Sequence, residues 1–306
     1  MHFSNRKARR TILVTGATLA LCLTTLVAIR LVTGRSLGLK SWGMQQAQSV
    51  TSLVRSVSNS QHVRSYNHGE FTNIVFLHHS VGGNLIEQSD LRERLTKAGY
   101  TFWDHDYNGY GLRKPDGSPA GYSYNVPNDN TDPDGLAAIF AQPVDKLPLN
   151  TFSGLLQHEV ILFKSCFPVS DIISEAKLQE YKVHYFNMRA VMDKHPDKLF
   201  IVVTPPPLNP AETKPEIAVR ARAFANWLKS DEFLKGHPNI FTFDLFDQLA
   251  GDDPPQSDYN MLRKAYQDGT DSHPNRQANE TIGPLVADFV IRTAQAYRAE
   301  YRFSSH

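Results

Sequence analysis

Ser80 has the local surroundings of a nucleophilic serine. It follows an apolar run in the segment Leu77-His-His-Ser-Val-Gly-Gly-Asn84, where a strand-like stretch turns into a helix-like one. The N-terminus of a helix offers free backbone N–H groups and the positive end of a dipole, which suit a serine nucleophile and its developing oxyanion. The alternative is a helix N-cap, because serine hydroxyls also accept hydrogen bonds from first-turn amides.

A nucleophilic serine needs a base, and the segment from Asp268 to Asn275 offers one. It reads Asp-Gly-Thr-Asp-Ser-His-Pro-Asn, and it precedes the last helix-like stretch. His273 in this segment can accept a proton, and Asp271, two residues before it, can orient the imidazole. A structural role is the alternative for a histidine of this kind.

The elements that must position these residues alternate along the chain. Short apolar runs predict strands at 73–78, 101–104, 159–163, 199–204 and 240–243. Helical periodicity lies between them, at 84–98, 170–192, 215–235 and 275–299. Five strands with crossover helices predict a three-layer α/β/α domain with a five-stranded parallel sheet. Ligands bind at the carboxyl ends of such strands, so the loops that follow the strands should carry the chemistry.

These residues resemble a known family. A serine directly after the first strand and an Asp/His-Pro-Asn loop before the last helix resemble the SGNH (GDSL-like) hydrolase superfamily, over roughly residues 71–295. The resemblance implies the SGNH-hydrolase, flavodoxin-like form of the fold, with Ser80 as nucleophile and His273 as base. The first block reads His-His-Ser where the family has Gly-Asp-Ser, so the resemblance depends on the serine and its position.

The last block also departs from the family pattern. The family places an aspartate three residues before the histidine, whereas this chain has Thr270 there. The orienting acid is therefore Asp271 or Asp268, and a Ser-His dyad without an acid is a third option.

The family's oxyanion donors are replaced as well. The third block supplies an asparagine in the family, and Ser165 or Cys166 lies near that place here. The glycine of the second block corresponds to Gly109, with Asn108 as a further candidate donor. The resemblance thus gives four oxyanion candidates.

The stretch 106–158 between the second and third predicted strands is rich in Gly, Pro, Asn, Asp and Tyr. Compact domains usually connect elements in about 4–6 residues, so a longer connection is typical of a lid or a substrate-binding insertion. Four of its tyrosines are candidates for stacking on sugar rings, with packing as the alternative: Tyr107, Tyr110, Tyr122 and Tyr124.

The N-terminus predicts a membrane anchor. Residues 11–29 carry no charge, and as a helix they would span roughly the hydrocarbon core of a bilayer. Basic residues precede the run, which favours a cytoplasmic N-terminus and an extracytoplasmic C-terminal domain. We expect a cytoplasmic segment (1–10), a transmembrane anchor (11–33), a linker (34–70) and the hydrolase-like domain (71–299). A cleaved signal peptide is the alternative.

Composition excludes several classes of protein. The chain has 306 residues, with 32 Lys and Arg against 31 Asp and Glu, so nucleic-acid binding through phosphates has no electrostatic basis. Two cysteines, Cys22 and Cys166, provide neither a disulfide framework nor a cysteine-based zinc site.

We therefore expect a membrane-anchored serine esterase or deacetylase that acts on a small-molecule or carbohydrate ester. This chemistry needs no cofactor and no metal. An O-acetyltransferase with the same residues and a noncatalytic binding or assembly module on the same fold are the alternatives. Metal-dependent hydrolysis is disfavoured because two of its four candidate ligands, adjacent on one strand, point to opposite faces; the four are His78, His79, His105 and Asp106.

Overall fold

The computed structural model describes residue 54 and residues 69–145, 148–254 and 256–304. The expected cytoplasmic segment (1–10) and membrane anchor (11–33) lie outside these residues, as does nearly all of the expected linker. Within the described residues, no helix combines the length and the apolarity that a bilayer crossing requires.

One sheet of six strands, in the order β3-β2-β1-β4-β5-β6, forms the centre of the domain. The five strands that the sequence predicted run parallel to one another; four of them differ from the prediction by one residue at one end, and the fifth is unchanged. They are β1 (Asn73–Leu77), β2 (Thr101–His105), β4 (Val160–Phe163), β5 (Leu199–Val203) and β6 (Ile240–Phe243).

The expectation of a purely five-stranded parallel sheet is wrong at one edge. A sixth strand, β3 (Leu112–Arg113), pairs antiparallel with β2 and lies inside the 106–158 stretch. The chain reverses at Gly111, which has a φ of 67° and leaves no room for a Cβ because Tyr122 O would lie 2.5 Å away. A strand of two residues is too short to show the alternating apolar pattern by which strands are predicted from sequence. Only its pairing with β2 in the folded structure identifies β3 as a strand.

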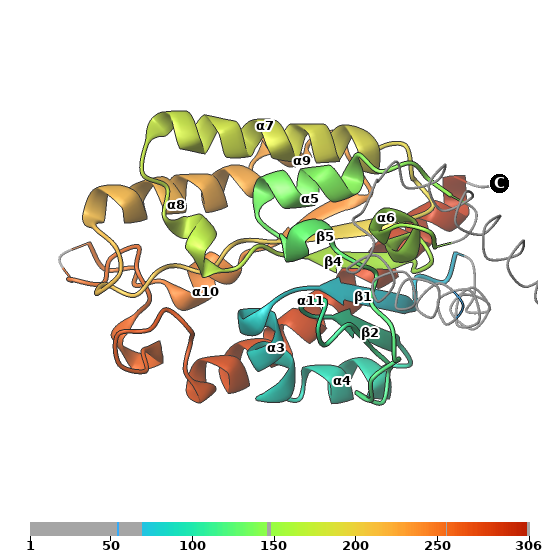
Figure 1. Ribbon diagram of the computed structural model, residues 1–306, viewed down its shortest axis with the longest axis horizontal. Coiled ribbons are helices and arrows are strands. Elements are labelled where there is room, and N and C mark those ends of the chain that lie inside the picture. The colour runs from blue at the N-terminus through green and yellow to red at the C-terminus, as the bar shows by residue number, and fades with distance from the viewer. Residues whose placement is uncertain (1–53, 55–68, 146–147, 255, 305–306) are drawn as a thin grey trace, which may run out of the picture. The chain divides into compact units, whose positions relative to one another are not determined.

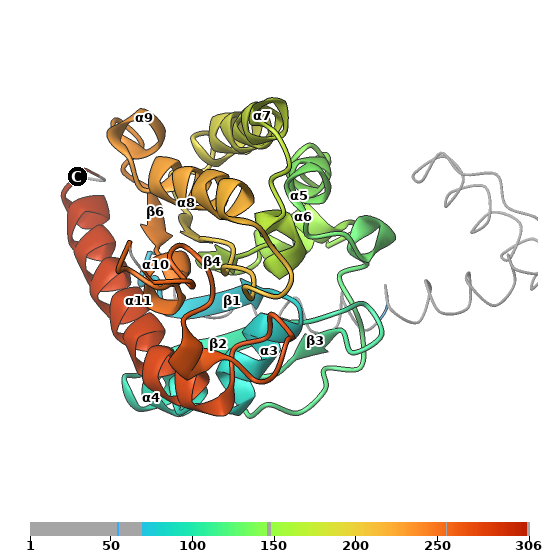
Figure 2. The ribbon, with the colours of Figure 1, turned by 90° about the vertical axis from the view of Figure 1, so that its left-hand side faces the viewer.

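Helices cover both faces of the sheet (Figures 1 and 2). One face carries α5 (Pro133–Phe140), α7 (Glu175–Met192), α8 (Pro215–Leu228) and two short helices, α6 (Thr151–Leu155) and α9 (Asp231–Leu234). The other carries α3 (Ser80–Glu87), α4 (Leu91–Lys97) and α11 (Arg276–Ser304), with α10 (Leu245–Leu249) after β6. Among the described residues, short 3-10 helices lie at Pro127–Asp129, Phe167–Ser170 and Lys264–Tyr266.

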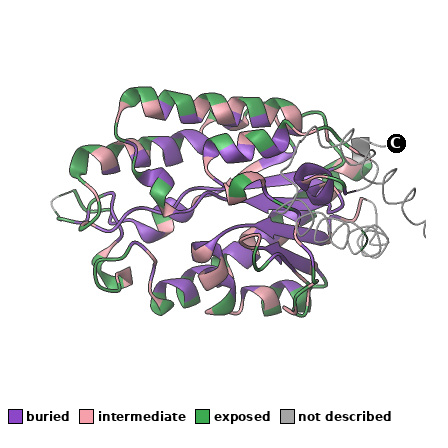
Figure 3. Cartoon of the chain, in the orientation of Figure 1, coloured by how far each residue is buried: buried purple, intermediate pink, exposed green. Residues whose placement is uncertain are grey.

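Side chains of the central strands alternate between two hydrophobic cores. In β1, Val75 and Leu77 belong to the core on the α7 side, whereas Ile74 and Phe76 belong to the core on the α11 side. All five residues of β1 are buried (Figure 3). A sheet covered on both faces explains why these strands read as continuous apolar runs in the sequence.

The helix boundaries differ from the sequence prediction at two breaks. The helix expected at 84–98 is two helices, because the Ser89 hydroxyl donates to Leu85 O and accepts from Leu91 N at the break. The helix expected at 215–235 also divides, and Ser230 lies between α8 and α9. Side-chain hydrogen bonds of serine to nearby backbone compete with helix continuation.

Much of the 106–158 stretch belongs to the core. Tyr122 and Tyr124 are 5% and 4% exposed, and the Tyr124 hydroxyl lies 2.7 Å from His158 Nε2. Leu136 and Phe152, from α5 and α6, are completely buried. The expectation that Tyr122 and Tyr124 could stack on a sugar is therefore wrong, because both pack in the interior.

Helix α3 lies unusually close to the end of β1. A Cβ on Gly82 would lie 2.4 Å from the Cβ of His78, a separation that real side chains do not show. Glycine at this position allows α3 to pack directly against the end of β1. This packing, called the seating of α3 below, fixes the position of Ser80, the first residue of the helix.

The substitution Gly82→Ala tests this seating. We expect it to lower the free energy of unfolding by about 1–3 kcal/mol, the usual cost of overpacking, which outweighs the roughly 0.5–1 kcal/mol that alanine gains over glycine inside a helix. Urea unfolding followed by circular dichroism measures the change.

Gly109→Ala is the matched control, because a Cβ there meets no atom within 4 Å. It should change the free energy of unfolding by no more than about 0.5 kcal/mol. Equal stability of the two variants would show that α3 does not need the glycine.

Candidate active site

Ser80 is the first residue of α3, at the carboxyl end of β1. The N-cap of this helix is His79, whose backbone is extended and whose side chain makes no capping bond. The Ser80 hydroxyl instead contacts two side chains, His273 and Cys166. The N-cap interpretation of Ser80 is therefore wrong, and its hydroxyl points into a cluster of polar side chains.

His273 lies between Ser80 and Asp271. Its Nε2 is 2.8 Å from Ser80 Oγ, and its Nδ1 is 2.9 Å from both carboxylate oxygens of Asp271. An ionised carboxylate only accepts hydrogen bonds, so Nδ1 must carry the proton and Nε2 is left to accept from the serine. This is the tautomer that a general base requires.

The local turn explains why Asp271 takes this place. The backbone N–H of His273 donates to Asp271 Oδ1 at 3.2 Å, which folds the carboxylate back onto the imidazole two residues later. Burial raises the pKa of Asp271, but hydrogen bonds from the His273 side chain and backbone outweigh this effect and hold the pKa below its ordinary value. Asp268 is exposed, and its backbone bridges to Asp271.

The cluster is open to solvent on one side. The side chains of His273 and Asp271 are 30% and 57% exposed. The ring of Phe167 packs edge-on against the imidazole, with 4.8 Å between ring centroids, and so limits the rotation of His273. The imidazole is thus held in orientation while it stays accessible to water.

One of the four oxyanion candidates touches Ser80. Cys166 Sγ lies 3.5 Å from Ser80 Oγ, and the residue is 9% exposed. The first-turn N–H groups of α3 lie beside this contact, and such groups have no acceptor within their own helix. A negatively charged oxygen next to Ser80 would meet the positive end of α3.

The other three candidates do not contact Ser80 through their side chains. Asn108 uses its amide within its own loop, donating to Val126 O and accepting from Val126 N and Ser123 Oγ. Ser165 is buried and donates to Thr131 O on the opposite face of the sheet. Gly109 is exposed in the turn after β2. The side chains of Asn108 and Ser165 are therefore occupied elsewhere. Asn108 is bonded to Val126 and Ser123, and the pleat after β4 turns Ser165 to the opposite face.

An aromatic pair, Tyr107 and Tyr110, packs against His79, the residue before Ser80. Tyr107 stacks on the ring of His79, with 3.9 Å between centroids, and Tyr110 packs edge-on against Tyr107. Tyr110 is 66% exposed. Of the four tyrosines singled out in the sequence, these two lie at the carboxyl edge of the sheet.

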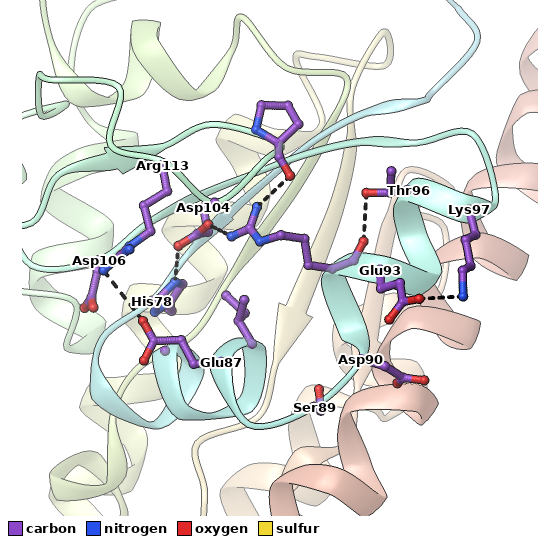
Figure 4. Close-up of a pocket in the computed structure, with 15 residues that line it drawn as sticks. His78, Glu87, Ser89, Asp90, Glu93, Thr96, Lys97, Asp104, Asp106 and Arg113 are labelled. Atoms are coloured by element: carbon purple, nitrogen blue, oxygen red, sulfur yellow. Dashed lines mark hydrogen bonds and ion pairs between the residues drawn. The ribbon is translucent and has the colours of Figure 1, made fainter.

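A polar cleft lies between α3, α4, β2 and β3 (Figure 4). Its volume is about 440 Å³, and His78, Asp104 and Arg92 line it, whereas Ser80 and His273 do not. Asp104 pairs with Arg92 and lies 3.2 Å from His78 Nε2. Burial raises the pKa of Asp104, but the bond from His78 and the Arg92 charge outweigh it and lower the pKa.

The four residues of the metal alternative do not converge. His78 faces Asp104, while His79 stacks on Tyr107 on the other side. His105 is fully buried, lies 3.0 Å from Ser123 Oγ, and has a pKa lowered to about 3 by burial. No group of three potential ligands that could hold a metal occurs in the described part of the chain.

Sequence reasoning missed two features of this region. Phe167 orients the imidazole, and the buried lysine Lys164 follows β4 directly. A signal for Lys164 was present, because a charge at the end of a fully apolar strand is uncommon.

The comparisons with known proteins add little to this geometry. No family model matches the chain, and no curated protein matches it. Among solved structures, it is similar to one described as "a putative platelet activating factor from Streptococcus pneumonia", with 13% identity and a TM-score of 0.44. The similarity covers 83% of this chain and 100% of that chain. A similarity of this size carries no information about activity.

Replacement of Asp271 tests the assignment of the acid. Asp271→Asn keeps the shape of the side chain but removes its charge, so the imidazole loses the partner that fixes its tautomer. We expect kcat for ester hydrolysis to fall by about 10²-fold or more, with an unchanged melting temperature.

Asp268→Asn is the control, because Asp268 makes no side-chain contact with His273 in the described structure. It should retain kcat within about twofold, an energy difference of roughly 0.4 kcal/mol. The opposite ranking of the two variants would reassign the acid, and full activity of both would identify a Ser-His dyad.

Proposed function

We propose that this protein is a serine ester hydrolase that works through an acyl-enzyme. The observation that carries the proposal is the chain of contacts from Ser80 Oγ to His273 Nε2 and from His273 Nδ1 to Asp271. Nucleophile, base and orienting acid lie within hydrogen-bond reach in the order that acyl transfer requires.

The reaction follows from the proton positions. His273 Nε2 takes the proton of Ser80 as the serine oxygen attacks the ester carbonyl. The tetrahedral oxyanion lies against the first-turn amides of α3. The intermediate collapses when His273 returns the proton to the departing alcohol, which leaves an acyl-serine. Water attacks this ester in the second half, with His273 again as base, and the free acid is released.

Hydrolysis is favoured over transfer to a second alcohol by the exposure of the base. His273 and Asp271 are open to solvent, so water can reach the acyl-serine. An acetyltransferase would use the same residues and would have to exclude water from them. We place the chain among the SGNH-like hydrolases on its residue pattern, with an acyl ester, including that of a carbohydrate, as substrate.

Covalent labelling tests the nucleophile. A fluorophosphonate probe should label the wild-type protein, and Ser80→Ala should abolish both labelling and turnover of p-nitrophenyl acetate. Because Ser80 is not a cap, this variant should keep its melting temperature. Gel fluorescence and absorbance at the p-nitrophenolate band give the two readouts.

Ser89→Ala is a matched control with the opposite expectation. Ser89 bridges α3 and α4, so its loss should lower the free energy of unfolding by about 1 kcal/mol. Labelling should remain. If Ser80→Ala retained labelling, or if Ser80→Asn restored turnover, the proposed nucleophile would be wrong.

The location of the domain is part of the proposal. We place the catalytic domain outside the cytoplasm, held by the predicted anchor at 11–33. Full-length protein should then stay with the membrane fraction after a carbonate wash, and external protease should digest the domain. A soluble product that begins near residue 35 would show that the anchor is a cleaved signal instead.

A further inference from the structure

A fully buried lysine lies at the carboxyl end of β4, two residues before Cys166. Lys164 is 0% exposed, and its Nζ makes no hydrogen bond with any described residue. Buried ammonium groups are normally paired, because their transfer out of water is costly. A buried ammonium group without a hydrogen-bond partner does not stabilise the fold, so its presence needs another explanation.

The sheet register places Lys164 in a row of charged and titratable side chains. The ladder continues one residue beyond the strands, since Lys164 N donates to Leu77 O and His78 N donates to His105 O. Extending the pairs Leu77↔Phe163 and Leu77↔His105 by one position sets Asp106, His78 and Lys164 side by side. This row crosses the sheet where β1 leads into α3.

The side-chain direction of Lys164 follows from the pleat. Leu162 belongs to the core on the α11 side, and Ser165 reaches the opposite face at Thr131. Lys164 therefore points to the same side as Cys166, whose Sγ lies 3.5 Å from Ser80 Oγ. The Lys164 side chain therefore lies on the face of the sheet that α3 covers, the same face as Cys166.

Electrostatic coupling agrees with this placement. Burial lowers the pKa of Lys164, while Cys166 and Asp106 act in the opposite direction. Lys164 in turn contributes to the lowered pKa of His79, whose main cause is burial. Lys164 thus interacts electrostatically with Cys166, whose thiol contacts the Ser80 hydroxyl, and with His79, the residue before Ser80.

We propose that Lys164 is an electrostatic positioning residue of this site, whose buried ammonium stabilises the negative charge that develops beside Ser80 during acyl transfer. This role for Lys164 rests on the proposed esterase function and deepens it. Lys164 does not touch the substrate, because it is completely buried, and it acts through the field at the Ser80–Cys166 contact. A fixed positive charge in a dry environment needs no rearrangement when the oxyanion forms.

The substitution Lys164→Met tests this role by replacing the ammonium with an apolar side chain of similar length. We expect kcat and kcat/KM for p-nitrophenyl acetate to fall about 10–10²-fold, with KM changed less than about threefold, because the interaction exists only in the transition state. The melting temperature should stay the same or rise, since the cost of burying an unpaired charge is removed.

Lys198→Met is the matched control. Lys198 is also buried, at 9% exposure, but it precedes β5 at the opposite end of the strands and pairs with Asp197. It should keep kcat within about twofold. Lys164→Gln provides a second neutral variant, and it should reproduce the kinetic loss of Lys164→Met.

The pH profile supplies a readout that a purely structural lysine would not change. The wild-type kcat should fall on the alkaline side as Lys164 loses its proton, and the fall should be absent in Lys164→Met. The titratable groups that face Lys164 are Asp106, His78, His79 and Cys166. Cys166→Ala should retain the alkaline fall, because the proposal assigns this fall to Lys164.

Several results would overturn the proposal. They are an unchanged kcat in Lys164→Met, an equal loss in Lys198→Met, or failure of both neutral variants to fold, which would assign the lysine a structural role. Absence of Ser80 labelling in the wild type would overturn the proposed function itself, and this inference with it. If the wild type turned over the ester normally and Lys164→Met had the same kcat, the inference alone would be overturned.

Discussion

The seating of helix α3 on the end of β1 determines the geometry of the whole site. Gly82 allows the helix backbone to approach His78 more closely than any other residue would permit. The approach fixes the position of Ser80 and aims the first-turn amides at the same point. The Ser80 hydroxyl and the positive end of the α3 dipole therefore share one location, which neither would occupy if the helix lay further from the sheet.

Two buried charged residues near the carboxyl ends of the central strands, Asp104 and Lys164, differ in how far their burial is compensated. Asp104 has two partners in His78 and Arg92, so its burial is compensated. Lys164 has no hydrogen-bond partner among the described residues, so the effect of its burial is opposed only by electrostatic interactions with Asp106 and Cys166. Proteins tolerate such groups where a fixed field is useful, and removal of a buried charge often leaves a fold equally or more stable. His78, which binds Asp104, and Lys164 are neighbours in the row that crosses the sheet where β1 leads into α3.

Much of this arrangement could be predicted from the sequence. The five parallel strands were identifiable because strands buried on both faces are apolar throughout, which is a local signal. Ser80 was identifiable because it follows such a strand and precedes two glycines, and His273 because Asp271 stands two residues before it. Each of these inferences needs only neighbours in the chain, and the structure brings the three residues together.

Only the tertiary structure decided which further side chains lie near Ser80 and His273, because this depends on the direction in which side chains point from neighbouring strands and turns. It selected Asp271 over Asp268, because only the turn at residues 271–273 brings a carboxylate onto the imidazole. It also brought Cys166 to the serine while the pleat turned Ser165 away. The register of β4 on β1 placed Lys164 beside His78, at the point where β1 leads into α3. Register and pleat are set by packing between segments distant in sequence, and no local pattern encodes them.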